Sequence, residues 1–509
     1  MMPADTASSS RRPAPGLVLG LLLVAGLGTS VNLHKSIWLD EAFTLERTRG
    51  SLEQVLHWAR FTSLKPPLYF VLVSWWRKLD PSIEWTRAFS TLCMLGAVAY
   101  FHGLSRALRI GGSWLSLGLL AALTPHFLWA AAEARPYALT ILFLASALYH
   151  ASRLWFAESA HPWRDAVLLV LAGYGALLSF YYAGFVLAAL FLAGLLARDV
   201  RRVVWPGVAL AVLMIPWLGQ ISEHTSGQAG SYMVPVIPEG AGTLAGSATA
   251  LAWLARQVPA IIFRGAPVVN RPIFLLAFGL LLAAILALRL RTGRPRWTRV
   301  ETAFVLYAGL GFAMLAALRL ANRTTVDMRH WIVVVPGLVL LPSLLAARVE
   351  PARRGRILLA GLAVYLSAGL VSFVRNERTR DWRSPAETVT QRERPGEPII
   401  LLGENPLPFQ YYYRGSNSIT RWPVNPYTSN RVDREWQVAE ADRRHLENLL
   451  DRAEPPERSF WMVERVWPGS APDVVERTLG ERPEVLAVWA FHQTRLYHLR
   501  RTGGGNSPP

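Results

Sequence analysis

The chain has 509 residues, of which 52% are hydrophobic and only 17% are charged, and its formal net charge is +18. A soluble domain carries about 25% charged residues, so this composition argues against a soluble enzyme and against a disordered protein. The single cysteine, Cys93, excludes an intramolecular disulfide. A positive excess of this size is also found in nucleic-acid-binding proteins, but here the apolar content indicates a membrane protein and no nucleic-acid partner.

Apolar runs of membrane-spanning length recur from the N-terminus to residue 374. A membrane helix needs roughly 20 mostly apolar residues, and on that basis the sequence predicts about eleven transmembrane helices. The expected spans are 15–33, 86–104, 114–132, 136–153, 166–182, 183–198, 203–220, 272–290, 300–318, 331–347 and 357–374. The stretch 242–264 is interrupted by Arg256 and Pro259, and we expect it to be interfacial or re-entrant.

The arginines indicate which side of the membrane each loop faces. If the spans alternate, basic clusters such as Arg201–Arg202 and Arg348–Arg356 fall on one side, which is cytoplasmic by the positive-inside rule. The loops 34–85 and 221–271 and the region after Val374 then lie outside. We therefore expect a multi-pass protein of a bacterial inner (plasma) membrane, with a cytoplasmic N-terminus and a periplasmic or extracellular C-terminal domain.

The last part of the chain has the composition of a soluble domain. Residues 375–509 contain mixed charges and only short apolar runs, and about 130 residues is a normal domain size. The pattern predicts strands at 399–402, 460–463, 485–490 and 495–499 and a helix at 433–450. The expected organisation is a helical polytopic membrane domain, 1–374, followed by a small α/β domain, 375–509.

The first outer loop, 34–85, contains the adjacent carboxylates Asp40 and Glu41 beside a membrane-anchoring Trp38. A carboxylate that is partly desolvated at the interface gains proton affinity, so Asp40 is a candidate general base. Glu41 could support Asp40, bind a metal or cap a helix. An adjacent Asp-Glu pair is also common at the start of an ordinary solvated helix, and spacing alone favours that simpler interpretation.

Two further features of this loop concern its backbone. Ser51-Leu52-Glu53-Gln54 matches a helix N-cap with Gln at the third position, and the following apolar stripe predicts a surface helix. The run Pro67–Leu79 is apolar but too short to span, so we expect it to lie in the interface.

Several charged and aromatic residues mark the expected outer ends of later spans. Arg135, before Pro136, and Arg329 could each grip a phosphate at headgroup depth, or could simply snorkel to the interface. His330 could ligate a metal, but a hydrogen-bonded structural role is the simpler interpretation, and Arg264 is a weaker phosphate candidate. Other residues with interfacial positions are Tyr181 and Tyr182, which suit an aromatic belt.

The order of these features resembles the polyprenyl-phosphate-sugar-dependent glycosyltransferases of the GT-C class, in particular the family 39 protein O-mannosyltransferases and the lipid A aminoarabinose transferases. The matching segments are Trp38–Glu41, Lys65–Leu68, Trp85–Ser90, Ala134–Ala138, Arg329–Trp331 with Pro336, and Asp381–Arg383. The resemblance covers about the first 390 residues in layout.

The resemblance implies transfer of a hexosyl or pentosyl group from a polyprenyl-phosphate donor to an acceptor hydroxyl, with inversion, on the outer face. Asp40 would be the general base, with Glu41 beside it. The donor phosphate would be bound by Lys65, Arg135 and Arg329, and the substrate pocket would include Tyr137, Tyr181, Tyr182 and His330. The acceptor could be a lipid, a glycan or a protein, and membrane lipids are expected partners.

The chain departs from the family pattern at some positions. Ala42 follows the acidic pair where an aromatic or polar residue is common, and His330 stands where many bacterial members have Tyr. No Asp-x-Asp motif is present, so no cofactor is certain, although a divalent metal near Glu41 is possible. Alternatives are a lipid-linked sugar flippase or transporter, a glycan-polymer ligase that would not need Asp40, and a scaffold protein that binds through its tail.

Overall fold

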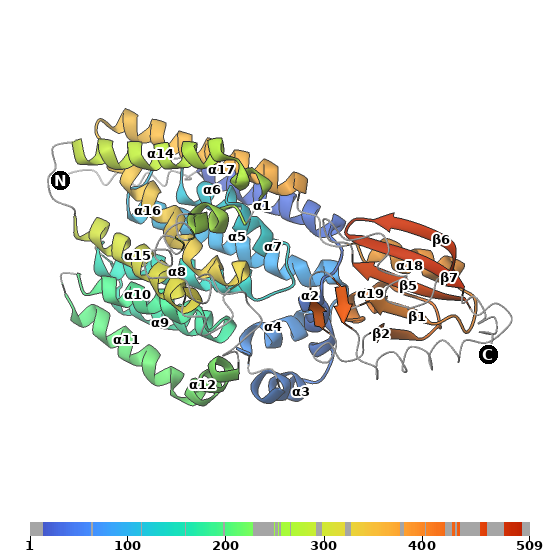
Figure 1. The fold of residues 1–509 in the computed structure, drawn as a ribbon. Coiled ribbons are helices and arrows are strands. Elements are labelled where there is room, and N and C mark those ends of the chain that lie inside the picture. The colour runs from blue at the N-terminus through green and yellow to red at the C-terminus, as the bar shows by residue number, and fades with distance from the viewer. Residues whose placement is uncertain are drawn as a thin grey trace, which may run out of the picture. The chain divides into compact units, whose positions relative to one another are not determined.

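We describe the protein from a computed structural model. The described residues are 14–62, 65–112, 114–157, 159–196, 199–227, 249, 253, 256–264, 266–291, 298–320, 327–376, 381–402, 404–422, 430–432, 435–437, 459–465 and 483–500. The chain forms two compact units (Figure 1). One comprises Met1–Leu33 and Arg47–Glu377, and the other comprises His34–Glu46 and Arg378–Pro509, so the segment that carries Asp40 groups with the C-terminal domain.

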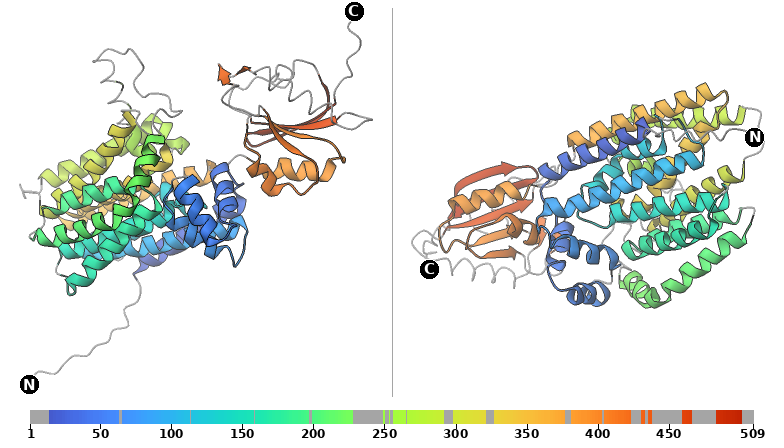
Figure 2. Two further views of the ribbon diagram at one scale, coloured as in Figure 1. Left: turned by 90° about the horizontal axis from the view of Figure 1, so that it is seen from below. Right: turned by 180° about the vertical axis from the view of Figure 1, so that it is seen from behind.

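The first unit is a bundle of helices, many of which lie side by side (Figure 2). Its elements are α1 (Pro15–His34), α3 (Leu52–His57), η1 (Trp58–Thr62), α4 (Leu68–Trp76), α5 (Ile83–Ala107), α6 (Leu117–Ala122), α7 (Pro125–Ala131), α8 (Tyr137–Trp155), α9 (Pro162–Ser179), α10 (Ala183–Gly194), α11 (Arg201–Met214), η2 (Ile215–Trp217), α12 (Leu218–Gly227), η3 (Pro267–Asn270), α14 (Pro272–Arg291), α15 (Arg299–Leu320), η4 (Met328–Val334), α16 (Val335–Ala347) and α17 (Ala352–Asn376).

All eleven expected spans fall on helices, but the count of eleven is not confirmed. Seven helical segments of the described chain are long and apolar enough to cross a membrane: Pro15–His34, Ile83–Ala107, Arg201–Glu223, Pro272–Arg291, Arg299–Leu320, Met328–Ala347 and Ala352–Asn376. The expected span 114–132 is divided into α6 and α7 because Pro125 begins a new helix behind Thr124. Of the stretch 242–264, residues 256–262 are helical, and most of the rest lies outside the described residues.

The elements of the first outer loop follow the sequence pattern. Ser51 caps α3 and forms a capping box with Gln54, as predicted. Helix α4 has nine residues, which is too few to span a bilayer. The two ends of the loop meet, because the Asn32 side-chain amide donates a 3.0 Å hydrogen bond to the Glu84 carbonyl. Arg87 in turn donates to the Asn32 carbonyl at 3.0 Å.

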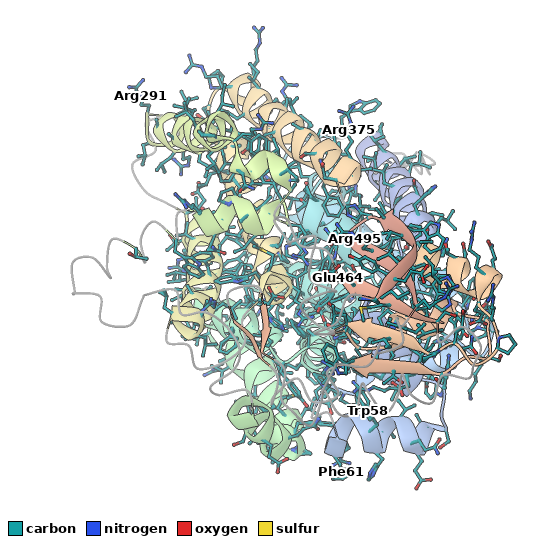
Figure 3. The ribbon with its side chains drawn as sticks, turned by 45° about the vertical axis from the view of Figure 1, so that its right-hand side comes forward. Trp58, Phe61, Arg291, Arg375, Glu464 and Arg495 are labelled. Atoms are coloured by element: carbon teal, nitrogen blue, oxygen red, sulfur yellow. The ribbon has the colours of Figure 1, made fainter. Side chains whose placement is uncertain are left out.

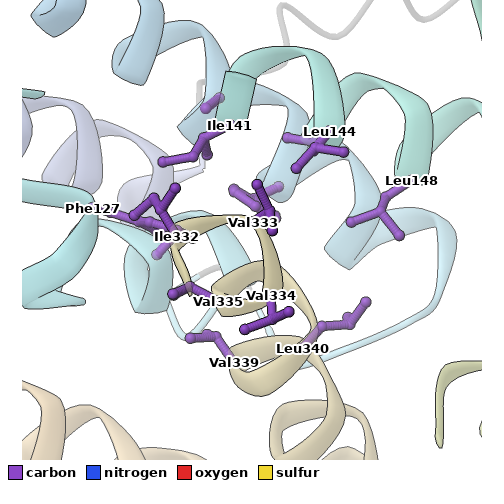
Figure 4. Packing of buried hydrophobic residues seen from close by; sticks show 14 of the residues in the cluster. Phe127, Ile141, Leu144, Leu148, Ile332, Val333, Val334, Val335, Val339 and Leu340 are labelled. Carbon is purple, nitrogen blue, oxygen red and sulfur yellow. The ribbon is translucent and has the colours of Figure 1, made fainter. Parts of the chain in front are cut away.

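The centre of the bundle is formed by η4 and α16. Of the apolar window in Met328–Ala347, 72% is buried, more than in any other candidate span of the described residues. Figure 4 shows Ile332 and Val333 facing the apolar side chains Ile141 and Leu144 of α8. The element that carries Arg329 and His330 is therefore held by close packing on several sides.

The second unit is built on a five-stranded sheet with the order β2-β1-β5-β7-β6. Its elements are α2 (Leu39–Arg47), whose last residue lies in the first unit, α18 (Arg383–Arg392), β1 (Ile399–Leu402), α19 (Leu407–Tyr412), β2 (Ile419–Trp422), β3 (Asn430–Val432), β4 (Glu435–Gln437), β5 (Ser459–Arg465), β6 (Glu484–Phe491) and β7 (Thr494–Arg500). Strand β1 runs parallel to β2 and β5, and β7 pairs antiparallel with β5 and β6.

Burial explains this strand order. All four residues of β1 are buried, as expected for a central strand covered on both faces. Trp382, Ala386 and Phe409 of the α18 and α19 region pack on one face, against a cluster that includes Ile399 and Leu401. Figure 3 labels Glu464 and Arg495, which are paired in register across β5 and β7.

The predicted strands at 399–402, 460–463, 485–490 and 495–499 are confirmed. The predicted helix at 433–450 is wrong where it can be compared, because Glu435–Gln437 forms β4 and pairs with β3. Backbone pairing decides the conformation of such a short segment more than its local pattern does. The remainder of 433–450 lies outside the described residues.

Candidate active site

The two carboxylates of the first loop have different environments at the start of α2. Glu41 is fully buried, and its carboxylate accepts a hydrogen bond of 3.5 Å from the Trp38 backbone N–H. This is the reciprocal half of a capping box, in which the third helical residue reaches back to the N-cap. Asp40 is half-buried, and Thr44 donates to its backbone carbonyl at 3.0 Å. Glu41 therefore caps the helix, which was one of its three predicted roles.

The residues before α2 are held by the C-terminal domain. The Ile37 N–H donates to the Tyr412 hydroxyl at 2.9 Å, and the Trp382 N–H donates to Ser36 Oγ at 3.0 Å. Ser36 and Ile37 are both buried. Sequence reasoning missed these contacts, because bonds between residues more than 340 positions apart leave no local pattern.

The Arg135 corner lies between α7 and α8. Ser90 of α5 donates to the Glu133 carbonyl at 2.5 Å, and Thr91 donates to the Ala131 carbonyl at 2.9 Å. Arg135 itself is 7% exposed, so its charge is held in the protein. An arginine that merely snorkels would keep its head in water, and this burial favours the binding role over the snorkelling one.

Five aromatic rings form a continuous group behind this corner, which we call the aromatic cluster: Trp129, Tyr137, Phe180, Tyr182 and His330. Neighbouring ring centroids are 4.9 Å apart for Trp129–Tyr137 and 5.7 Å for Tyr137–Phe180. The imidazole of His330 stacks on both Phe180, at 5.8 Å, and Tyr182, at 4.7 Å. The structure thus brings together three of the four residues predicted for the substrate pocket, and adds Trp129 and Phe180, which the sequence did not single out.

His330 and Arg329 begin the η4 turn. His330 Nδ1 accepts a 2.8 Å hydrogen bond from the Asp327 N–H, while the Asp327 carboxylate accepts from the Met328 N–H at 2.6 Å. This capping arrangement agrees with a hydrogen-bonded structural histidine. Arg329 Nε lies 3.6 Å from the Asp327 carboxylate, and its side chain is partly exposed.

Arg264, the weaker phosphate candidate in the sequence, lies against the aromatic cluster in the structure. Its guanidinium lies over the Trp129 ring at 4.1 Å, within cation–π distance. The neighbouring His126 is fully buried, and its Nδ1 lies 2.7 Å from the Ile261 carbonyl. The segment 256–264 therefore brings an arginine to the aromatic cluster.

Lys65 and Tyr181 are the remaining predicted site residues. Lys65 is half-buried, and its backbone is fixed by Gln220 of α12, whose amide donates to the Lys65 carbonyl at 3.0 Å. Tyr181 is half-buried in the turn before α10. Among the residues that the structure describes, no group of three His, Cys, Asp or Glu side chains is placed to hold a metal ion.

A cavity of about 880 Å³ lies away from the aromatic cluster. It is lined by Trp155 at the end of α8 and by residues at the starts of α11 and α15, including Arg202 and Arg299. Tyr137 of the aromatic cluster begins the same helix α8, which is about 28 Å long. Arg202 there is already paired with Asp199 at 3.3 Å. The cavity is therefore not the predicted site.

Comparison with solved structures identifies the fold of the chain. No protein-family model and no curated protein match the chain. ArnT from Cupriavidus metallidurans in the apo state matches with a TM-score of 0.58 at 15% identity, over 95% of this chain and 97% of that chain. The same protein bound to undecaprenyl phosphate matches with a TM-score of 0.56 at 14% identity, over the same shares. The Archaeoglobus fulgidus oligosaccharyltransferase complex with Zn and sulfate matches with a TM-score of 0.47 at 13% identity, over 88% of this chain and 67% of that chain.

The protein is therefore a multi-pass α-helical protein of the GT-C fold with a small C-terminal sheet domain, as expected from the sequence. Its likeness extends over nearly the whole length of ArnT, the lipid A aminoarabinose transferase, and includes the C-terminal domain.

Proposed function

We propose that the protein is a membrane glycosyltransferase that transfers a sugar from a polyprenyl-phosphate donor to an acceptor hydroxyl on the outer face of the membrane. The transfer inverts the anomeric configuration, and Asp40 is the general base. The fold is that of ArnT, and one of the matching ArnT structures holds undecaprenyl phosphate. The proposal includes the expected orientation, with the N-terminus in the cytoplasm and the C-terminal domain outside.

The observation that carries the proposal is the contact of Arg264 with the aromatic cluster, whose rings come from the same chain segments as two further arginines. Arg264 stacks on Trp129, Arg135 stands two residues before Tyr137, and Arg329 directly precedes His330. Planar guanidinium groups bind phosphate oxygens in pairs, and aromatic faces suit the apolar side of a sugar or isoprenoid. A guanidinium on an aromatic wall, in a fold that is also found in a protein bound to undecaprenyl phosphate, favours a lipid-linked phosphate as ligand.

The chemistry needs two kinds of assistance. The acceptor oxygen attacks the anomeric carbon, the bond from that carbon to the phosphate oxygen breaks, and the acceptor proton passes to the Asp40 carboxylate. The bond electrons leave with the polyprenyl phosphate, whose added negative charge is stabilised by Arg135, Arg329 and Lys65. The half-buried position of Asp40 supports its role, because partial desolvation makes a carboxylate a better proton acceptor. Glu41 contributes by capping the helix that carries Asp40.

The test compares Asp40→Asn with Asp80→Asn, which alters an exposed aspartate of the same outer loop. The Asp80 carboxylate accepts a 2.7 Å hydrogen bond from the Ser82 N–H in a turn, and we give it no part in the reaction. Mass analysis of lipids and glycoconjugates from cells with and without the gene identifies the sugar and the acceptor. We expect Asp40→Asn to insert normally but to lose the gene-dependent product, while Asp80→Asn retains it. A product undiminished in Asp40→Asn would remove Asp40 from the mechanism.

A further inference from the structure

Residues 34–46 form part of the C-terminal unit although they lie far from it in sequence. They run from His34, the last residue of α1, through most of α2, whose second residue is Asp40. They are joined to the domain by the hydrogen bonds described above, from the Ile37 N–H to the Tyr412 hydroxyl and from the Trp382 N–H to Ser36 Oγ. Both bonds fall within the four residues that precede Asp40.

These bonds are strong constraints because of where they lie. Ile37 is 0% exposed, and a buried backbone N–H without a partner destabilises the structure that buries it. The Tyr412 hydroxyl satisfies that donor. Residues 35–38 have no regular secondary structure, so no helix or strand of their own fixes this backbone, and the bonds to the domain do so.

The partners of these bonds are themselves fixed by the domain core. The Trp382 side chain is 3% exposed and packs with Ala386 and Phe409. Tyr412 ends α19, and its ring centroid is 5.1 Å from the Arg383 guanidinium and 5.0 Å from the Tyr411 ring. Neither anchor can shift without disturbing the domain.

The constraint continues to Asp40 through the first turn of α2. The Trp38 carbonyl accepts from the Glu41 and Ala42 N–H groups, each at 3.0 Å, and the Glu41 side chain caps the same residue. Ala42 and Leu45 are buried. Hydrogen bonds thus hold the backbone from Ile37 to Ala42 both before α2 and in its first turn. Asp40 lies within this stretch.

We propose that the C-terminal domain is a working part of the catalytic centre, in which Tyr412 and Ser36 are positioning residues for the Asp40 carboxylate. This rests on the proposed function of Asp40. The domain then contributes to the rate of the reaction itself, and not only to recognition of the acceptor.

The experiment uses the full-length protein in nanodiscs and compares Tyr412→Phe with Tyr413→Phe. Tyr413 follows α19 directly, and its hydroxyl bonds to Glu393 and Asn417 inside the domain, so it controls for loss of a tyrosine hydroxyl. We expect Tyr412→Phe to speed amide hydrogen exchange in residues 34–46 about fivefold to tenfold, as for loss of one buried hydrogen bond. Tyr413→Phe leaves exchange in that segment unchanged.

Activity is measured on the product identified by mass analysis, and donor-site binding is measured with undecaprenyl phosphate as the probe. We expect Tyr412→Phe and Ser36→Ala to lower the transfer rate about tenfold, the factor for 1.4 kcal/mol, with unchanged affinity for undecaprenyl phosphate. Ser36→Thr, which keeps the hydroxyl acceptor, restores the rate. Wild-type exchange or a wild-type rate in Tyr412→Phe would overturn the proposal.

The exchange measurement needs no substrate, so it is independent of the proposed reaction. If the wild-type protein binds undecaprenyl phosphate but transfers no sugar, the proposed function fails, and the catalytic role of Tyr412 fails with it. Faster exchange in Tyr412→Phe would then establish the contact alone. If transfer occurs but exchange and rate are insensitive to Tyr412, only the positioning role is lost.

Discussion

The imidazole of His330 and the phenol ring of Tyr182 stack at 4.7 Å with an angle of 20° between their planes. His330 also accepts a hydrogen bond at Nδ1 from the Asp327 backbone, so one side chain joins the η4 cap to the aromatic cluster. Arg329, the preceding residue of the same turn, lies 3.6 Å from the Asp327 carboxylate through its Nε. The following variants separate these contributions.

Replacing His330 separates ring stacking from capping. His330→Phe keeps an aromatic face against Tyr182 but removes the acceptor for the Asp327 N–H, and we expect a loss of about 1 kcal/mol of stability with undecaprenyl phosphate affinity reduced at most about threefold. His330→Ala removes both and should weaken binding further. Thermal unfolding and binding titrations in nanodiscs provide the measurements. Equal affinities in the two variants would show that the stack has no part in binding.

Arg135 is predicted to bind the donor phosphate. Arg135→Ala should weaken undecaprenyl phosphate binding roughly 10- to 100-fold, the range for loss of a hydrogen bond to a charged group. Arg135→Lys should recover only part of it, because an ammonium group lacks the planar fork. Arg375→Ala is the matched control, since Arg375 is an exposed arginine at the end of α17. Equal affinity in Arg135→Ala and Arg375→Ala would return Arg135 to an interfacial role.

Glu397 is predicted to make the C-terminal domain sensitive to acid. Burial would raise the pKa of this carboxyl, but hydrogen bonds from His498, Ser459, the Arg394 backbone and Trp461 lower the pKa to about 2. The stabilisation is present above the ordinary pKa of 4.5 and is lost as the pH falls towards 2. Glu397→Gln should lower stability near pH 7 by roughly 2–3 kcal/mol and flatten this pH dependence.

The measurement for Glu397 is the rate at which pepsin cleaves the C-terminal domain of the full-length protein between pH 2 and pH 5. Cleavage of the wild type should increase steeply as the pH falls, relative to an unfolded reference peptide. Glu484→Gln is the control, since Glu484 forms an exposed pair with Arg500 at 3.0 Å. A wild-type profile in Glu397→Gln would disprove the prediction.

The orientation is tested with reporters. Alkaline phosphatase fused after Arg500 should be active, because the C-terminal domain is expected outside the cytoplasm, and a fusion at Asp199 should be inactive. The positive-inside rule gives both expectations. Activity in the Asp199 fusion alone would reverse the orientation of the protein.

Local sequence patterns predicted those parts of the fold that local physics decides. The apolar run of β1, the capping box at Ser51 and the lengths of the apolar helices each depend on neighbouring residues only. Pro125 is a local signal for a helix break, but the apolar character of the whole stretch 114–132 led to the prediction of one continuous span. Strand β4 was missed because it is formed by pairing with β3, and a periodic pattern within one short segment does not reveal such pairing.

The site could be predicted only in part for the same reason. Tyr137, Tyr182 and His330 stand at predicted helix ends, and the structure brings them together. Trp129 and Phe180 sit in apolar runs, where an aromatic residue is indistinguishable from ordinary core. The contact between Ile37 and Tyr412 joins residues 375 positions apart, and only the folded chain reveals it.

The hydrogen bond from Asn32 to the Glu84 carbonyl closes the first outer loop at its base. Within the loop, helix α4 also packs into the core of the bundle, where Tyr69, Phe70 and Val73 are buried. Closure entropy increases slowly, by about 0.6 kcal/mol for each doubling of loop length. Insertions between these anchored segments would therefore add little closure entropy and leave the helices of the bundle in place.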